Sequence, residues 1–307
     1  NNSHLYGAGV YLSGGSVWIE DCVFTTNAPQ QSSGRTWQGG ALYATGVSPL
    51  TLTNCVFRGN RMYGAGAGMY IASGSSARIL NCVFDGNYLG SGNSAMEGAS
   101  MRLAGSGLIS DCVVTGSVAG LAPDEVYVNN SAGESWAIWK TILGGGRGIG
   151  VSKQGGGTLA LTNSLVHSFT NHGIGAGAGS VNLASATFAN NGGWGVTNSA
   201  GGVTGRNCIA WGNTKGGFTN CSLTYTCSQE AQAGDGNKNA DPLFEGAETN
   251  NFQLLRASPA INVCPIEEWM VGTHDLAGNA RVKGRAVDMG AYEMVSPPAS
   301  GAMVVVK

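Results

Sequence analysis

A short block of one polar and three less polar residues recurs along the first three quarters of the chain. Residues 21–24 read Asp-Cys-Val-Phe, and the block returns at residues 54–57, 81–84 and 111–114. Five later, weaker copies place the Cys position at Thr141, Ser164, Ala186, Cys208 and Cys227. The spacing from copy to copy runs from 19 to 33 residues, which suits one turn of a β-solenoid.

Other positions keep the same period. An aliphatic residue lies three positions before the Cys position, an aromatic or aliphatic residue two positions after it, and an Asn five positions after it in most turns. A second short strand begins each early turn. Strands of successive turns pair about 4.8 Å apart, so equivalent residues stack in ladders. The pattern predicts an all-β, single-stranded parallel β-helix (β-solenoid) of about nine to ten turns over residues 1–228.

The cysteines follow the repeat. Cys22, Cys55, Cys82 and Cys112 run along the helix axis, so we expect buried free thiols; a metal site would need ligands that converge on one point. Cys221 and Cys264 fall outside the ladder, and whether they form a disulfide stays open, because sequence does not fix connectivity.

Beyond residue 228 the repeat stops. We expect residues 229–295 to form a non-repeating cap on an open solenoid end, whose strand edges otherwise invite pairing with other chains, and residues 296–307 to form a tail. Conspicuous cap segments are residues 240–244, 251–254, 258–262, 275–281 and 287–293. Within them Asp275 and Asp288, with Arg281 and Arg285, are expected to tie the cap down.

These cap segments resemble the C-terminal part of bacterial surface β-helix proteins of the choice-of-anchor Q type. The resemblance is specific over residues 240–293 and weaker over the turns. It implies a right-handed helix, secretion, and an extracellular or cell-surface location, and it implies no single reaction. In such proteins an anchoring or sorting segment often follows.

The composition argues against two classes of binding partner, nucleic acids and membranes. Only 11% of the residues are charged, the net charge is -2, and no Lys/Arg run indicates a nucleic-acid partner. No stretch approaches the roughly 18 apolar residues of a membrane span. The first residues, Asn1-Asn2-Ser3, are interpreted as those of a processed chain or a fragment.

Candidate catalytic residues are few. Arg58 and Asp85 occupy one outward column on adjacent turns, and His167 lies further along it; with Arg61 they would be the first residues of a polysaccharide lyase or glycoside hydrolase to test. The alternative is a surface ion pair of little energetic weight.

No cofactor is expected. One segment nevertheless carries side-chain oxygens at alternate positions, as a calcium-binding loop does. The residues concerned are Asp235, Asn237, Asn239 and Asp241. Ala240 stands where such a loop needs Gly and Gly246 where it needs an acid, so a simple turn at the cap is the alternative.

Two features indicate surfaces. The residue after the Cys position is aliphatic in most turns (Val23, Val56, Val83, Val113, Ile142, Leu165 and Ile209). If Cys and Phe face inward, this stripe faces outward as a contact surface, unless the corner resets the alternation or the cap covers it. Extra residues at 25–38, 61–66, 88–98 and 115–125 form loops on one edge, where Trp37, Tyr63 and Tyr88 are candidate ligand-binding aromatics.

We therefore expect a non-enzymatic extracellular or cell-surface rod with a structural, adhesive or filament-forming role. Its partners would be further copies or other surface proteins, and residues 303–306 would be a strand donor. The alternatives are a polysaccharide lyase or glycoside hydrolase, or a carbohydrate-binding module that uses the loop-lined edge.

Overall fold

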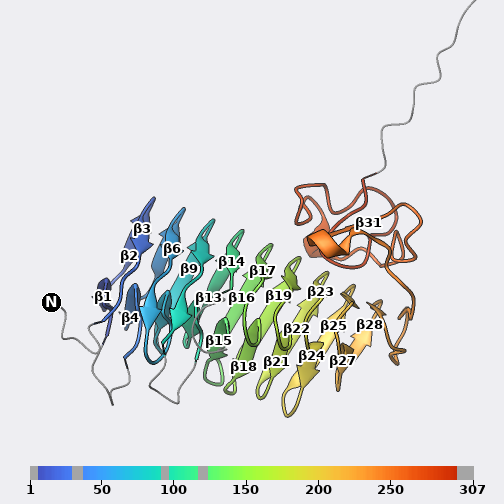
Figure 1. Cartoon of the computed structure of the whole chain (residues 1–307). Coiled ribbons are helices and arrows are strands. Elements are labelled where there is room, and N and C mark those ends of the chain that lie inside the picture. The colour runs from blue at the N-terminus through green and yellow to red at the C-terminus, as the bar shows by residue number, and fades with distance from the viewer. Residues whose placement is uncertain (1–5, 30–36, 91–96, 117–123, 296–307) are drawn as a thin grey trace, which may run out of the picture.

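A computed structural model describes residues 6–29, 37–90, 97–116 and 124–295 of the chain. Over these residues the protein is all-β, with three parallel sheets of nine strands each. Each turn contributes one strand to each sheet, and the turns stack along a straight axis (Figure 1). The protein is a right-handed parallel β-helix, as the repeat and the resemblance predict.

The three sheets are named by the order in which each turn visits them. The first sheet contains β1 (Val10–Ser13), β4 (Leu42–Thr45), β8 (Met69–Ile71), β12 (Met101–Leu103), β15 (Val126–Asn129), β18 (Val151–Gln154), β21 (Ile174–Ala176), β24 (Trp194–Asn198) and β27 (Gly216–Thr219). The second contains β2 (Val17–Glu20), β5 (Leu50–Thr53), β9 (Ser76–Leu80), β13 (Ser106–Ser110), β16 (Ser135–Trp139), β19 (Thr158–Thr162), β22 (Ser180–Ala184), β25 (Gly202–Arg206) and β28 (Ser222–Thr224). The third contains β3 (Val23–Thr25), β6 (Val56–Arg58), β10 (Val83–Asp85), β14 (Val113–Thr115), β17 (Ile142–Gly144), β20 (Leu165–His167), β23 (Thr187–Ala189), β26 (Ile209–Trp211) and β29 (Cys227–Ser228).

The corner between the second and third sheets is the same in every turn. One residue there has a φ of 48° to 55°, the left-handed region that Asn and Asp tolerate best. These corner residues are Asp21, Asn54, Asn81, Asp111, Lys140, Asn163, Ser185, Asn207 and Tyr225. Alternation along the strand points Cys55 and Phe57 into the core and Val56 outward, and the corner at Asn54 lets Leu52, three residues before Cys55, face the core as well.

The Cys position carries a ladder of side-chain donors. The Sγ of Cys55 donates to the carbonyl of Thr53, two residues earlier and across the corner, at 3.3 Å. Thr141 Oγ1 makes the equivalent bond to Trp139 O at 2.9 Å, and Ser164 Oγ to Thr162 O at 2.7 Å. In the last turn our alignment is wrong by one residue: Cys227 pairs with Ile209, so Thr226 occupies the Cys position.

The Asn ladder passes amide hydrogen bonds between turns. The backbone N–H and the side-chain amide of Asn60 each donate to Asn87 Oδ1, at 3.1 and 2.9 Å, and Asn27 bonds Asn60 in the same way. Beside this ladder, Phe24, Phe57 and Phe84 stack with ring centroids 4.6 and 4.7 Å apart. The stacked columns form a continuous core of buried residues along the axis.

Cys221 and Cys264, whose pairing the sequence leaves open, form no disulfide. Cys221 and Cys264 are free thiols, like the other cysteines of the described residues. The Sγ of Cys221 donates to Thr219 O at the corner after the first sheet, whereas Cys264 is buried in the cap. The two cysteines therefore lie in different parts of the structure, Cys221 in the helix and Cys264 in the cap.

Residues 229–295 fold back over the outer face of the third sheet (Figure 1). They contain β30 (Phe244–Gly246), β31 (Asn251–Leu254) and the short 3-10 helices η1 (Ala247–Thr249) and η2 (Glu268–Met270). Phe252 packs against Leu165 and Ala189, and Ile209 belongs to the cap's own core. The cap thus covers the C-terminal half of the aliphatic stripe, whereas Val23 (67% exposed) and Val113 (40% exposed) stay uncovered.

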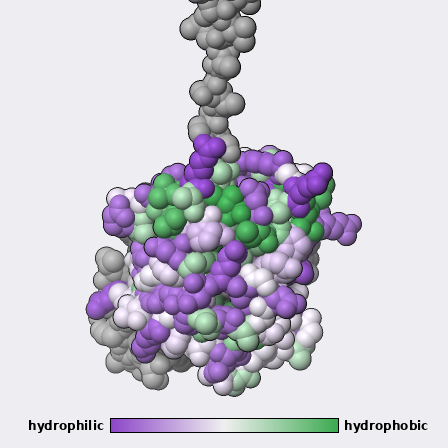
Figure 2. All heavy atoms as spheres, turned by 90° about the vertical axis from the view of Figure 1, so that its right-hand side faces the viewer, coloured by the Kyte–Doolittle hydropathy of each residue, from purple (hydrophilic) through white to green (hydrophobic). Residues whose placement is uncertain are grey.

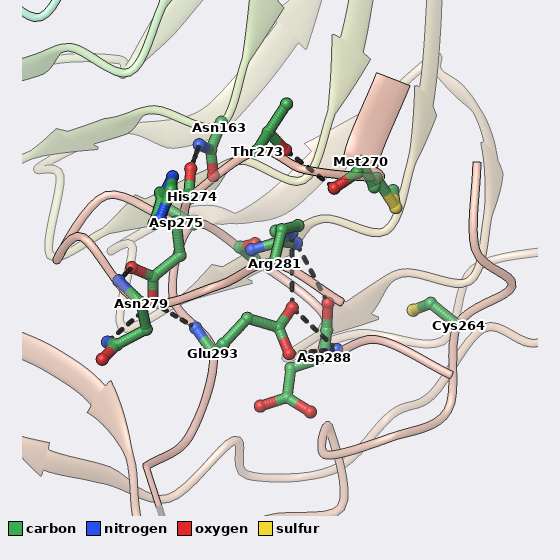
Figure 3. A network of polar contacts seen from close by, with 12 residues as sticks. Asn163, Cys264, Met270, Thr273, His274, Asp275, Asn279, Arg281, Asp288 and Glu293 are labelled. Atoms are coloured by element: carbon green, nitrogen blue, oxygen red, sulfur yellow. Dashed lines mark hydrogen bonds and ion pairs between the residues drawn. The ribbon is translucent and has the colours of Figure 1, made fainter. Parts of the chain in front are cut away.

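A buried polar network holds the cap together (Figure 3). Arg281, fully buried, pairs with Glu293 (Nε–Oε1 3.3 Å) and donates to the carbonyls of Asp288 and Gly290. Asp275 accepts from the backbone N–H groups of Asn279 and Glu293. These residues tie the cap down as the sequence predicts, except that Arg285 is exposed.

The end of the molecule that carries the cap is more apolar than the turns beneath it. Seen along the axis from this end, hydrophobic residues gather at the height of the cap (Figure 2). Exposed apolar side chains in the cap are Leu255, Ile266, Val271 and Val295. The expected strand donor at residues 303–306 lies outside the described residues, and so does part of three of the four expected loops.

Candidate functional site

A column of aromatic side chains crosses five successive turns on the outer face of the first sheet. Cα register places Tyr11 beside Tyr43, Tyr43 beside Tyr70, Tyr70 beside Arg102, and Arg102 beside Tyr127. Alternation along each strand points their neighbours, such as Leu42 and Met69, into the core. We call Tyr11, Tyr43, Tyr70, Arg102 and Tyr127 the tyrosine face.

The rings of the tyrosine face form one stack. Tyr11 and Tyr43 are parallel within 2°, with centroids 5.5 Å apart, and Tyr43 and Tyr70 follow at 5.0 Å and 27°. Tyr6 adds a tilted ring 4.8 Å from Tyr43. Exposure falls along the column, from 52% at Tyr11 to 8% at Tyr70. The N-terminal end of the stack therefore offers the most ring surface to a ligand.

Arg102 continues the stack as a planar cation. Its guanidinium lies 4.8 Å from the Tyr70 ring centroid and 5.8 Å from that of Tyr127, within the range of cation–π attraction. Its Nε is 3.2 Å from Glu97 Oε2, and the Tyr127 hydroxyl also bonds the Glu97 carboxylate. Glu97 thus compensates the charge of Arg102 and fixes its orientation.

Burial favours the neutral phenol at Tyr43, Tyr70 and Tyr127, because it raises the pKa of each. Burial, with the neighbouring tyrosines, raises the pKa of Tyr43 to about 12, and burial together with Glu97 raises the pKa of Tyr127 to about 12. Burial also raises the pKa of Asp124, a carboxyl near Glu97 that bonds the Ser152 hydroxyl. A neutral aromatic strip with one compensated ion pair is suited to stacking and hydrogen bonding rather than to ionic attraction.

Our sequence analysis did not identify this face as a site. A Tyr or Arg at the same place in each early strand of the first sheet was the available signal. The sequence predicts these strands, and alternation along them places the Tyr and Arg residues on the outer face. The contribution of Glu97 carries no repeat signal, because the positions that bridge to it in succession on the earlier turns, Ala65, Gln38 and Tyr6, are not acidic.

The candidate catalytic residues are spread over the third sheet. Arg58 and Asp85 form the expected ion pair at 2.9 Å, with their side chains 62% and 38% exposed. His167 lies three turns further on, about 14 Å away at the usual strand spacing. It packs against Gly144 and against Phe252 of the cap, and burial lowers its pKa. The structure therefore gives His167 a role in holding the cap and does not bring it to Asp85.

The loop aromatics differ from one another in exposure. Trp37 is only 4% exposed and packs with Met62 and Leu89 in a small separate core. Arg61 lies 5.0 Å from the ring centroid of Tyr63 and pairs with Tyr88 where β7 (Arg61–Met62) meets β11 (Tyr88–Leu89). Tyr63 and Tyr88 are half-buried, so they keep some accessible ring surface, whereas Trp37 keeps almost none.

The segment with calcium-loop spacing closes the last turn of the helix. Asn237 Oδ1 accepts from Thr226 N at 2.9 Å, Asn239 donates to Ser228 O, and Asp241 Oδ1 accepts from Leu243 N. Asp235 contributes its backbone carbonyl to Tyr225 N. Three of the four candidate ligand side chains thus make local hydrogen bonds, which favours the interpretation as a turn. Among the described residues no three His, Cys, Asp or Glu side chains are grouped as metal ligands would be.

Comparisons with known proteins concern the fold. A family model described as a right-handed β-helix region matches residues 1–132. Among solved structures, the crystal structure of pectate lyase Pel9A is similar at 14% identity and a TM-score of 0.49, over 94% of this chain and 83% of that one. No curated protein matches. In the part of the chain that is described, no helix is long and apolar enough to cross a membrane. The sheet topology and the family model together make this chain a right-handed parallel β-helix protein.

Proposed function

We propose that the protein is a rigid, non-catalytic extracellular β-helix that binds a glycan along its tyrosine face. The observation that carries the proposal is the unbroken column of four tyrosines and Arg102 on five adjacent turns. A polymer that lies along the helix axis would meet one such group at each turn. The rigid backbone of the stacked turns holds these groups in place before the ligand arrives, which lowers the entropic cost of binding.

The chemistry of the face favours a sugar. Aromatic rings offer large apolar area at low conformational cost and carry a hydroxyl for polar contact. Tyr11 and Tyr6 are 52% and 39% exposed, so they can receive a ring without rearrangement. The charge of Arg102 is compensated by Glu97, so the face does not select strongly for an acidic polymer.

Two features favour binding without turnover. The guanidinium of Arg102 is held between two rings and a carboxylate, so it is already engaged by neighbouring side chains. On the third sheet, Asp85 is paired with Arg58 and His167 is packed under the cap. The enzymatic alternative would need a further group to act as base or acid.

Affinity electrophoresis in gels that contain soluble polysaccharides tests the proposal. We expect the wild type to be retarded by at least one neutral polysaccharide, and Tyr11→Ala and Tyr43→Ala to be retarded at least several-fold less. Tyr88→Ala is the matched control, because it removes a tyrosine from the loop edge instead. If Tyr88→Ala abolished retardation and the two face variants did not, the loop edge would be the binding site. Release of reducing ends or of unsaturated products by the wild type would establish an enzyme.

A second function, self-association, is favoured by the uncovered half of the stripe. Val23, Val56, Val83 and Val113 continue the column that the cap covers further along, and Val23 is 67% exposed. Electron microscopy at several protein concentrations would show ordered filaments if the rods associate. Filaments that persist after deletion of residues 298–307 would exclude the tail as the strand donor. Single short rods at every concentration would contradict self-association.

A further inference from the structure

We infer that a second binding site, for a neutral sugar, lies between the outer face of the second sheet and the cap. An open groove of about 470 Å³ runs there over strands β16, β19, β22, β25 and β28, and the cap helix η2 borders it. It lies on a different sheet from the tyrosine face. The inference therefore stands on its own observations and does not depend on the proposed function.

Two tryptophans form one end of the groove. Trp139, the last residue of β16, and Trp269 of η2 meet edge to face, with ring centroids 5.2 Å apart. Both are only partly buried, so ring surface faces the groove. They come from positions 130 residues apart in the sequence, and the cap brings them together. Indole faces are suited to the apolar C–H surface of a pyranose ring, with a polar N–H at the edge.

The floor of the groove is flat and covered with small polar groups. Cα register aligns Ala160, Asn182, Thr204 and Ser222 in one outward column, and Trp139, Thr162, Ala184, Arg206 and Thr224 in the next. Thr204 Oγ1 donates to Asn182 Oδ1 at 3.0 Å, which leaves the Asn182 amide N–H groups for a ligand. Successive turns thus present hydroxyl and amide groups at regular intervals, which is the pattern that sugar hydroxyls need.

Charge at the wall of the groove is compensated. Arg206 Nη2 lies 2.6 Å from Glu267 Oε2, and the same oxygen accepts from Trp269 Nε1 at 2.8 Å. The other carboxylate oxygen, Oε1, is buried and has no hydrogen-bond partner. Glu267 therefore orients the indole through Oε2 and compensates the charge of Arg206, so that Arg206 is not a free cation that would attract an acidic sugar.

A peptide ligand fits this groove less well. Peptides commonly bind a sheet by adding a strand to an exposed edge. Strands β19, β22 and β25 are paired on both sides, so their backbone groups are already bonded to neighbouring turns. The groove is therefore lined mainly by side chains: aromatic, hydroxyl, amide and small apolar groups, with Arg206 paired to Glu267 at the wall.

Isothermal titration of the full chain with cellohexaose, xylohexaose, mannohexaose and hexagalacturonate tests the inference. We expect at least one neutral oligosaccharide to bind, and the acidic one to bind at least tenfold more weakly. Trp269→Ala should lower the affinity tenfold or more, since truncation of an aromatic anchor commonly has this effect. Trp269→Phe should recover part of the lost affinity, because an aromatic ring that can stack on the sugar is retained.

Two further variants separate loss of the site from loss of the fold. Thr204→Trp fills the floor from an exposed position and should abolish the binding that Trp269→Ala weakens, while leaving the circular dichroism spectrum unchanged. Trp18→Ala is the matched control, since Trp18 lies on the same sheet at the first turn and is 71% exposed; it should bind as the wild type does.

The outcomes for the two sites are distinguishable. Tyr11→Ala and Tyr43→Ala should leave the groove's affinity unchanged, and Trp269→Ala should leave retardation by the tyrosine face unchanged. The inference is overturned if no neutral oligosaccharide binds, if folded Thr204→Trp binds normally, or if hexagalacturonate binds best.

Discussion

At the scale of single residues, one position can be filled by chemically different side chains that make the same bond. Cys55, Thr141 and Ser164 each donate to the carbonyl two residues earlier, across the left-handed corner residue. That carbonyl also accepts from the backbone N–H of the corner residue in the preceding turn, as Thr53 O does from Asp21 N at 3.1 Å, so the side chain supplies its second hydrogen bond. Ala186 occupies the same position without a donor, so what the position requires is a small side chain, and the thiol and hydroxyl groups add a hydrogen bond.

The Asn ladder gives the first prediction. Asn60 is fully buried, accepts from Asn27, and donates to Phe24 O and Asn87. We expect Asn60→Ala to lower the free energy of unfolding by about 2–4 kcal/mol, because several buried groups lose partners. Urea unfolding measures this. The exposed Asn182→Ala should change it by less than about 0.5 kcal/mol; equal effects of the two substitutions would show that burial of the ladder is not the cause.

Lys153 gives the second prediction. It faces the core between Val128 and Ala176, is fully buried, and donates to the carbonyls of Gln154 and Gly155. Burial lowers its pKa to about 8. The unfolded chain therefore holds this proton up to a higher pH than the folded one, so stability rises with pH between about 8 and 10.5.

We expect the wild type to gain about 2–3 kcal/mol relative to Lys153→Met over that interval. Chemical unfolding at pH 7.5, 9 and 10.5 would show the change. The exposed Lys215→Met is the control, and its difference from the wild type should be flat with pH. A flat profile for Lys153→Met as well would mean that the ammonium is solvated in the folded state.

At the scale of elements, the turns stack columns whose exposure changes along the axis. In the first turn Cys22 is exposed and Phe24 only half-buried, whereas Cys55 and Phe57 one turn later are fully buried. The third sheet changes in the same sense, from exposed Val23 to covered Leu165 and Ile209. Equivalent residues thus have different reactivity, depending on what lies above them.

Thiol titration checks this gradient. The chain has eight cysteines and all are free, so Ellman's reagent should report eight thiols in denaturant. In the native protein Cys22 should react quickly and the others slowly. Burial raises the pKa of half-buried Cys221 to about 12, which keeps it in the unreactive thiol form. Cys22→Ser should remove the fast phase; six thiols in denaturant without reductant would indicate a disulfide after all.

At the scale of the whole molecule, the cap performs two tasks. It covers the apolar half of the third sheet through Phe252, and it forms one side of the groove on the second sheet through Trp269. Long-range hydrogen bonds fix it, including Asn163 Nδ2 to His274 O at 2.7 Å and Ala291 N to Thr187 Oγ1 at 3.0 Å. Changes in the cap should therefore alter the groove while leaving the tyrosine face intact.

The cap network gives the last prediction. We expect Arg281→Ala to destabilise the cap by about 3–5 kcal/mol, because it leaves Glu293 buried without its partner. Hydrogen exchange should accelerate in residues 229–295 and much less in turns one to four. Arg285→Ala, at an exposed arginine four residues away, is the matched control. Uniform acceleration over the whole chain would show that cap and helix unfold as one unit.

The sequence by itself determined the helix, its register and most of its ladders. Contacts between turns join residues 19 to 33 positions apart that recur in type, so periodicity alone encodes them. The register slipped only at Cys227, where the last copies are weakest. Asp85 with Arg58 could also be paired from the sequence, because they occupy the same column.

Only the tertiary structure decided where the cap lies and what the outer faces present. The contacts of Trp139 with Trp269 and of Asn163 with His274 join residues more than 100 positions apart, and each occurs once. The repeat in the sequence therefore does not predict them. The repeat in the sequence predicts the tyrosine column. The compensation of the Arg102 charge by Glu97 is not predicted, because Glu97 comes from a loop end. Repetition fixes what stacks, whereas the surfaces that bind are formed where non-repeating segments meet the stack.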